Sequence, residues 1–212
     1  MSGSLIIRQI FFKLAKLKTI INRKNAGTGL TCEPLAVSRN EHNTFKYLLY
    51  MKTQNQECCP TFEVEKWDKK SFNWENKLFL KESIFTFFHI PFPPMIGKKV
   101  MKMHSLAQKA EATIHDKSEA LILFRDPSAF KSEIFYSVTK EVDEANNATI
   151  SGSFIAGVLD GPYNSIPKYI KEMENYLKEK DQIAKDYYVH YAYCPKCAKE
   201  SGHNYMILFA LV

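Results

Sequence analysis

The sequence predicts an α+β fold in which a strand–helix–strand–strand unit occurs twice. Strand-like and helix-like patterns follow one another in the same order in both halves, with a period of about 70 residues. Proline and glycine turn signals separate these segments, and the content of 45% hydrophobic and 25% charged residues is typical of a globular protein. Two such units can share an antiparallel sheet, cover it with two helices and leave a ligand cleft between the repeats.

The first repeat is predicted to start with a buried strand, because residues 84–90 are apolar and β-prone and are followed by Pro91. A helix is expected at residues 96–110, where apolar side chains recur at spacings of four and three. Two further strands are expected at residues 120–124 and 133–138, with a turn at residues 125–128 between them. The aromatic residues before position 80 show no period, which favours an irregular segment that packs onto the domain.

The second repeat has the same order. A strand at residues 153–159 runs into the turn Asp160-Gly161-Pro162. A helix follows, with Ser165 as its expected N-cap and Pro167 in its first turn, where a missing N–H costs little. The helix is expected to bury one stripe of apolar side chains, formed by Ile166, Ile170, Met173 and Leu177. Two strands, at residues 187–193 and 205–212, then complete the repeat.

The N-terminal part differs from the rest in charge. Residues 1–32 hold six basic residues and no acid, while residues 33–212 hold 23 basic and 23 acidic residues. The balanced part gives no reason to expect nucleic-acid binding, which needs a clustered basic surface. We therefore divide the chain into a basic amphipathic extension and linker at 1–50 and a domain at 51–212. Nothing in the sequence indicates an oligomeric state.

The expected compartment is the cytoplasm. The chain has an odd number of cysteines, five, no secretory signal pattern, and no apolar run of the roughly 20 residues that span a bilayer. A mitochondrial location is the alternative, because residues 1–24 resemble an acid-free amphipathic presequence, although lysine outnumbers arginine there.

A family resemblance rests on the stretch Gly152-Ser-Phe-Ile-Ala-Gly-Val-Leu-Asp-Gly-Pro-Tyr163 and on the duplicated element order. This stretch resembles the signature of GyrI-like small-molecule-binding domains. The chain is more closely similar to a subgroup of small stand-alone proteins labelled hydrolases. That closer likeness is carried by Cys59-Pro60-Thr61-Phe62, Trp67, Trp74, Phe87-Phe88, Cys194-Pro-Lys-Cys-Ala-Lys199 and Asn204-Tyr205.

The resemblance implies a cleft between the repeats that is lined by aromatic residues and often holds a buried acid. Similar proteins act as drug sensors, and some hydrolyse reactive cyclopropane-bearing toxins. Sensor-type members carry a glutamate on the last strand, whereas residues 205–212 contain no acid. Either the acid comes from another element, or the ligand is not cationic.

Glu133 is the first candidate for chemistry, because strand alternation places it on one face with Phe135 and Ser137. A carboxylate beside aromatic side chains has a raised pKa and can act as a general base or recognise a cation. The alternative is a solvated residue at the mouth of the strand. Tyr188 and His190 share a face of a later strand, where His190 is either an acid–base group, a pocket wall or a hydrogen-bonded histidine in a packed sheet.

A metal site is the only cofactor that the sequence suggests. Cys194 and Cys197 are spaced as half of a tetrahedral zinc site, and Cys58, Cys59 or His203 could complete it. The alternative is a plain structural turn. Redox chemistry is disfavoured, because a redox Cys-x-x-Cys pair normally opens a helix and this one is expected between two strands.

The leading hypothesis is a module that binds an apolar or aromatic small molecule through Phe88, Glu133, Phe135, Tyr188 and His190. The second hypothesis is a hydrolase acting in the same cleft, with Glu133 orienting water and Tyr188 or His190 donating a proton. The third is a protein-interaction adaptor, which a large exposed apolar patch would favour. A DNA-binding regulator is disfavoured, because residues 1–50 contain no helix-turn-helix pattern.

Overall fold

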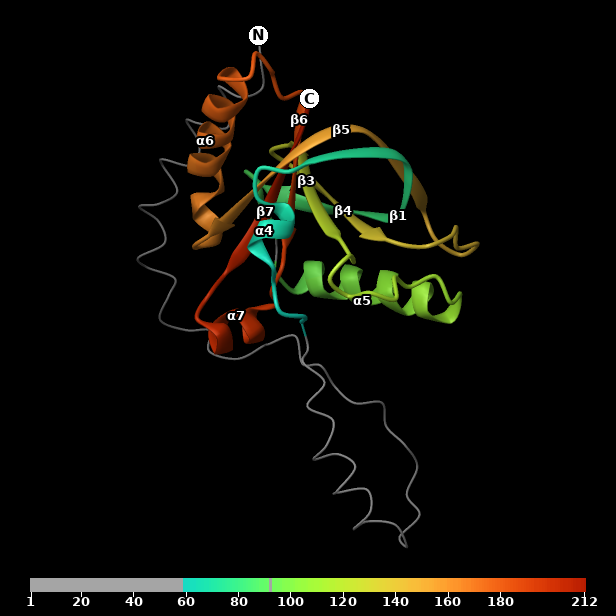
Figure 1. Ribbon diagram of the computed structural model, residues 1–212. Coiled ribbons are helices and arrows are strands. Elements are labelled where there is room, and N and C mark those ends of the chain that lie inside the picture. The colour runs from blue at the N-terminus through green and yellow to red at the C-terminus, as the bar shows by residue number, and fades with distance from the viewer. Residues whose placement is uncertain (1–58, 92) are drawn as a thin grey trace, which may run out of the picture.

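The computed structural model describes residues 59–91 and 93–212 (Figure 1). The expected N-terminal extension, its presequence-like helix and Cys58 therefore lie outside the described residues. Within the described ranges, no helix combines the length and the apolar character needed to cross a membrane.

The element order confirms the α+β class and the duplication. The first repeat consists of β1 (Ser71–Phe87), α5 (Pro93–Lys109), β3 (Ile122–Ser128) and β4 (Lys131–Ser137). The second repeat consists of β5 (Asn147–Asp160), α6 (Ile166–Lys178), β6 (Asp186–Tyr191) and β7 (Tyr205–Leu211). Short additions are α4 (Val64–Trp67), β2 (Ile90–Pro91), the 3-10 turn Tyr163–Ser165 and α7 (Pro195–Ser201).

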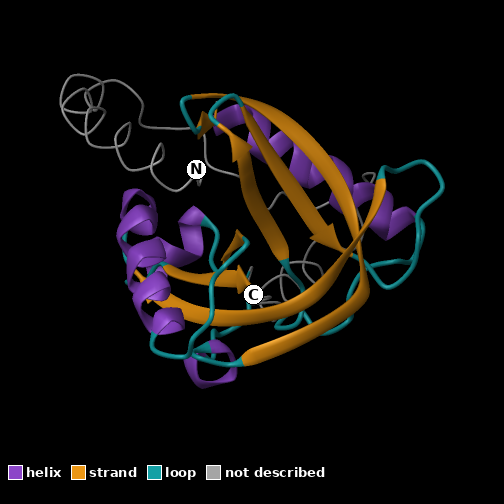
Figure 2. Ribbon diagram, turned by 90° about the horizontal axis from the view of Figure 1, so that it is seen from above, coloured by secondary structure: helices purple, strands orange, loops and turns teal. Residues whose placement is uncertain are grey.

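The main strands form one antiparallel sheet that closes on itself (Figure 2). The hydrogen-bonded order is β1-β4-β3-β6-β7-β5, and β5 pairs with β1 again. Closure is achieved because β1 is 17 residues long: its first half pairs with β5, and its second half pairs with β4. Phe79 and Leu80 have partners on both neighbouring strands. The result is a barrel with strand residues pointing alternately inwards and outwards.

The two long helices cover the outside of this barrel. Side chains of α5, such as Met103 and Ala107, pack on the outward-facing residues of β1 and β4. Met173 and Leu177 of α6 pack on outward-facing residues of β5, β6 and β7, as the predicted helical stripe requires. Ser165 occupies the N-cap position of α6 with Pro167 in the first turn, as predicted, but its side chain makes no capping hydrogen bond.

Aromatic side chains fill the barrel. Trp74, Phe154 and Phe209 lie at its centre, with ring centroids 4.3 Å apart for Trp74–Phe154 and 5.2 Å for Trp74–Phe209. Further buried members of this interior cluster are Trp67, Phe79, Leu121, Leu123, Phe135, Ile150, Ala156, Tyr188 and Ile207. Burial of such rings provides most of the stabilising free energy of the interior. The aromatic core thus occupies the space between the repeats.

The first strand begins 13 residues earlier than the sequence predicts, at Ser71 rather than at residue 84. A β-bulge hides its period: the register shifts between Trp74 and Lys77, and Asn76 has a positive φ of 48°. Before the bulge the even-numbered residues face the interior, and after it the odd-numbered residues do, because the bulge inserts one extra residue. Trp74 and Phe79 therefore both face the interior. The segment that appears irregular in the sequence is therefore a continuous strand.

The third strand also departs from expectation. Residues 125–128 were expected as a turn because of Asp126 and Pro127, but they form the end of β3. The turn lies at residues 129–130 instead. Proline is tolerated there because β3 pairs irregularly with β4 between Arg125 and Ser128.

Gly152 provides a test of the closure. It pairs with Trp74 next to the bulge, its φ is +142°, and a Cβ atom there would lie 2.5 Å from a methyl carbon of Leu211. Gly152→Ala is expected to lower the free energy of unfolding by roughly 1–3 kcal/mol. Urea denaturation measures the change, and Ser153→Ala at the neighbouring exposed position is the matched control. Equal stability of the two variants would contradict the strain argument.

Candidate functional site

Glu133 lies at one end of the barrel, on the inward-facing side of β4, and its side chain is only 4% exposed. Three cationic groups surround its carboxylate. Lys81 Nζ of β1 lies 3.0 Å from Oε1, Lys131 Nζ lies 3.0 Å from the same oxygen, and Arg125 Nη1 of β3 lies 3.1 Å from Oε2. Both carboxylate oxygens are therefore engaged.

These cations connect Glu133 to aromatic side chains. Lys81 Nζ lies 5.2 Å from the centre of the Phe135 ring, and the Arg125 guanidinium lies 5.9 Å from the centre of the Tyr188 ring. The Arg125 Nε also donates to Asp186 Oδ2 at 2.5 Å. Of the residues that the sequence singles out, Glu133, Phe135 and Tyr188 are thus brought together. We call Lys81, Arg125, Lys131, Glu133 and Asp186 the charged cluster.

The electrostatics of Glu133 differ from the expectation of a raised pKa. Burial acts to raise the pKa, but hydrogen bonds from Lys81 and Lys131, their charges and the Arg125 hydrogen bond lower it to about 2. A carboxylate with such a pKa is ionised at neutral pH and is a weak proton acceptor. Its lysine and arginine neighbours outweigh the aromatic surroundings on which the expectation was based.

The two proton-donor candidates lie in different surroundings. Tyr188 is 8% exposed, and burial raises the pKa of its hydroxyl, so it keeps its proton at neutral pH. His190 Nδ1 lies 3.1 Å from the backbone nitrogen and 3.2 Å from the carbonyl oxygen of Ile122. Burial lowers the pKa of His190 to about 4, which leaves the ring neutral at pH 7. Its geometry is that of a hydrogen-bonded histidine in a packed sheet.

Phe88 lies in the turn after β1, with a positive φ of 50°. Its ring centroid is 4.7 Å from that of Phe87 and 5.5 Å from that of Phe130 in the β3–β4 turn. Phe85 stacks on Phe130 at 6.4 Å. Phe85 and Phe87 are each 63% exposed, and Phe130 is 49% exposed. We call Phe85, Phe87, Phe88 and Phe130 the aromatic tip.

The strand register connects the aromatic tip with the charged cluster. Phe85 pairs with Lys131, and Ser83 pairs with Glu133, so these four residues share one side of the sheet. A recess of about 380 Å³ lies elsewhere, and none of its lining residues belongs to the expected site; they are Ser71, Asn73, Ser153, Phe154, Ile155, Lys180, Gln182 and Val212. Of the expected site residues, Glu133, Phe135 and Tyr188 are buried inside the filled barrel, whereas Phe88 belongs to the aromatic tip at its end.

The cysteine pair lies in the connection between β6 and β7. Cys194 is the N-cap of α7, and its Sγ accepts a hydrogen bond from the backbone N–H of Cys197 at 3.5 Å. The pair therefore opens a helix, which corrects the expectation that strands flank it directly and removes that argument against redox chemistry. Pro195 in the first turn of α7 is a helix-start signal that was available in the sequence.

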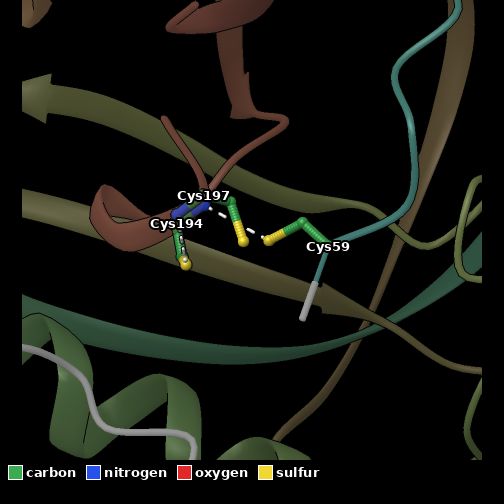
Figure 3. Close-up of side chains that lie close together, drawn as sticks. All are labelled: Cys59, Cys194 and Cys197. Atoms are coloured by element: carbon green, nitrogen blue, oxygen red, sulfur yellow. Dashed lines mark hydrogen bonds between the residues drawn. The ribbon is translucent and has the colours of Figure 1, made fainter. Parts of the chain in front are cut away.

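Cys59 joins this pair from a segment far away in the sequence (Figure 3). Its Sγ accepts a hydrogen bond from the backbone N–H of Cys194 at 3.4 Å. Burial raises the pKa of the Cys59 thiol to about 12. His203, the other described residue considered as a ligand, instead has its Nδ1 2.7 Å from Asp160 Oδ2 and stacks on Tyr205.

Comparison with known families decides the membership of the chain. Residues 49–212 match the family model described as "Bacterial hydrolase". The chain belongs to this bacterial hydrolase family. A search of curated proteins gives no match. Among solved structures, the chain is similar to an uncharacterized conserved protein from Listeria innocua, with 10% identity and a TM-score of 0.49 over 71% of this chain and 98% of that one.

For this member of the bacterial hydrolase family, sequence reasoning missed the partners of Glu133. Lys81 and Arg125 lie on β1 and β3, and Asp186, which pairs with Arg125, lies on β6, so only the closed sheet brings them together. Lys131 carried a signal, because alternation along β4 places it on the same face as Glu133.

Glu133→Gln tests the charged cluster through pH dependence. The folded pKa of about 2 lies below the ordinary value of 4.5, so the ionised group stabilises the fold above pH 4.5 and loses this effect as the pH falls towards 2. At pH 7 the variant is expected to lose roughly 1–3 kcal/mol in free energy of unfolding. The difference from the wild type should shrink between pH 4.5 and pH 2, as followed by urea denaturation.

The matched control is Glu141→Gln, which makes the same exchange at an exposed position. It is expected to change stability by less than about 0.5 kcal/mol. A stability difference between wild type and Glu133→Gln that stays constant down to the lowest pH would contradict the assignment of a lowered pKa.

Proposed function

We propose that this chain binds a small molecule with an apolar or aromatic body and a neutral or anionic polar group. The binding surface is the aromatic tip together with the adjoining charged cluster. The observation that carries this proposal is the shared sheet face, on which exposed Phe85 stands opposite Lys131 and two residues from Glu133 across the ladder. An aromatic body can stack on the tip, while its polar group reaches the cations.

The charge of the cluster selects the polar group. Lys81, Arg125 and Lys131 provide three positive charges against the two carboxylates of Glu133 and Asp186. Lys131 is half exposed, so its ammonium can share an acceptor on a ligand at little desolvation cost. A cationic group would meet a carboxylate whose oxygens already accept from three cations. The cluster therefore favours anionic or neutral acceptors.

The resemblance to GyrI-like domains supports the same class of function, because those domains consist of two such repeats and bind small molecules. The last strand lacks the glutamate of sensor-type members. Together with the engagement of Glu133 by its three cationic neighbours, this favours a ligand that is not cationic. The GyrI-like membership itself is part of this proposal.

A matched series of probes tests the proposal on the full chain. Pyrene sulfonate, pyrene methanol and pyrene methylammonium carry the same ring with a negative, neutral or positive group. The sulfonate is expected to bind most tightly and the ammonium most weakly in fluorescence titrations. Lys131→Gln should weaken sulfonate binding roughly two- to fivefold, the range expected for an exposed charge. Lys102→Gln on the outer face of α5 is the matched control and should change nothing.

Two outcomes would contradict this proposal. One is tight binding of pyrene methylammonium, and the other is an equal response of Lys131→Gln and Lys102→Gln. A protein-interaction adaptor remains the third hypothesis, because the aromatic tip is an exposed apolar patch of the kind that it requires. An adaptor surface predicts no dependence on the charge of a small probe.

A hydrolase is the second candidate, and the family description favours it. Glu133, held ionised, would orient a water molecule by hydrogen bonding, and Tyr188 would donate its proton to a leaving group. Lys81 and Arg125 would stabilise the negative charge that develops on a substrate oxygen. His190 is unsuited as the acid, because it is neutral at pH 7.

Hydrolysis of p-nitrophenyl acetate by the full chain tests this candidate. Tyr188→Phe and Glu133→Gln are each expected to reduce kcat/KM roughly 100-fold, the usual effect of losing a proton donor or an orienting group. Pyrene sulfonate binding reports separately whether the surface is intact. Turnover that is unchanged in both variants would remove the charged cluster from any hydrolytic mechanism.

A further inference from the structure

Three cysteine thiols converge at the opposite end of β6 from the charged cluster. Cys59 precedes α4, whereas Cys194 and Cys197 lie at the start of α7, after the end of β6. Their Sγ atoms all lie within 4.8 Å of one another, and each residue is half-buried. Figure 3 shows the sulfur atoms of Cys59 and Cys197 facing each other, with Cys194 beside them.

The backbone around these sulfurs is arranged to stabilise negative charge. The N–H of Cys194 donates to Cys59 Sγ at 3.4 Å, and the N–H of Cys197 donates to Cys194 Sγ at 3.5 Å. Hydrogen bonds from N–H groups to sulfur strengthen when the sulfur becomes a thiolate. When a metal ion displaces the thiol protons, these two N–H groups can stabilise the thiolates that form.

The spacing fits a tetrahedral ion. Zinc–sulfur distances of about 2.3 Å separate the sulfurs of a tetrahedral site by about 3.8 Å. The observed limit of 4.8 Å is close enough that small side-chain rotations bring all three sulfurs to this spacing. Thiolate ligands select zinc over magnesium or calcium, which prefer oxygen ligands.

We propose that Cys59, Cys194 and Cys197 bind one Zn²⁺ ion. Binding forms three zinc–sulfur bonds and releases the protons of the thiols to solvent. His203 is not part of this site, because its ring nitrogens are not among the ligand atoms that lie within 4.8 Å of one another. The site does not depend on the small-molecule surface at the other end of β6.

The zinc ion would fasten the start of the described chain to the β6–β7 connection. Cys59 and Cys194 are 135 positions apart, so the ion closes a long loop. Neighbouring contacts follow the same path: the N–H of Phe62 donates to the Tyr193 hydroxyl at 3.1 Å, and the Phe62 ring stacks on Tyr205 at 5.1 Å. Trp67, which follows in α4, is buried against Phe72 and Phe209 of the barrel.

The full chain, purified under reducing conditions without added metal, provides the test. Elemental analysis is expected to find about one zinc ion per chain, and replacement by Co²⁺ should give the charge-transfer and d–d absorption of a tetrahedral thiolate site. Cys59→Ser and Cys197→Ser each remove a ligand and should each lower zinc affinity by more than tenfold, because loss of a group that only supports a ligand already costs about 10–100-fold. Cys32→Ser, the same exchange at a cysteine that the proposal does not include, should keep the full metal content.

A second measurement keeps the proposal testable if a serine variant fails to fold. Mercurial titration of the wild-type thiols should release zinc in step with the modification of three cysteines, and chelation should lower the melting temperature until zinc is restored. Four results would overturn the proposal. They are reduced protein that takes up no zinc, unchanged affinity in Cys59→Ser, octahedral Co²⁺ spectra, and loss of metal in Cys32→Ser alone.

Discussion

The double pairing of β1 is the constraint on which the rest of the structure depends. Its first half hydrogen-bonds to β5 and its second half to β4, so one strand closes the sheet and joins the two repeats. Closure removes both sheet edges and gives the aromatic rings a common interior. It also fixes the end of the barrel at which β1 and β4 bring Lys81 and Glu133 together. The helices then need only cover the outer face.

Element order and helix positions could be predicted, because periodicity and turn residues are local signals. Met173 and Leu177 are buried as their spacing predicts, and the strand–helix–strand–strand order occurs twice. The length of β1 could not be predicted. Between Trp74 and Phe79 its bulge moves the inward-facing residues from even to odd positions. A strand is recognised in a sequence by strict alternation of apolar and polar residues, and the bulge interrupts that alternation. The residue types at 125–128 favour a turn, but the irregular pairing of β3 with β4 tolerates Asp126 and Pro127 within the strand.

The sequence predicted only part of the candidate site, because many of its contacts join different strands. Alternation placed Glu133 with Phe135, and the structure adds Tyr188 through Arg125. The pKa of Glu133, however, is set by cations from other strands, and no local pattern reports which lysine lies opposite which carboxylate. The thiol cluster shows the same limit. The Cys194–Cys197 spacing is visible in the sequence, whereas the approach of Cys59 depends on how the first described segment crosses the barrel end.

The duplication has a consequence for how the two halves are related. Equivalent strands pair with each other across the repeats, β1 with β5 and β3 with β6, and both pairings are antiparallel. Such self-pairing of equivalent elements is what a twofold rotation axis produces at an isologous interface. The barrel is thus an internal pseudo-dimer held in one chain. Each functional candidate includes one of two equivalent connections: Phe130 lies in the β3–β4 turn, and Cys194 and Cys197 lie in the β6–β7 connection. The two halves differ there, because the first connection is a short turn and the second contains α7.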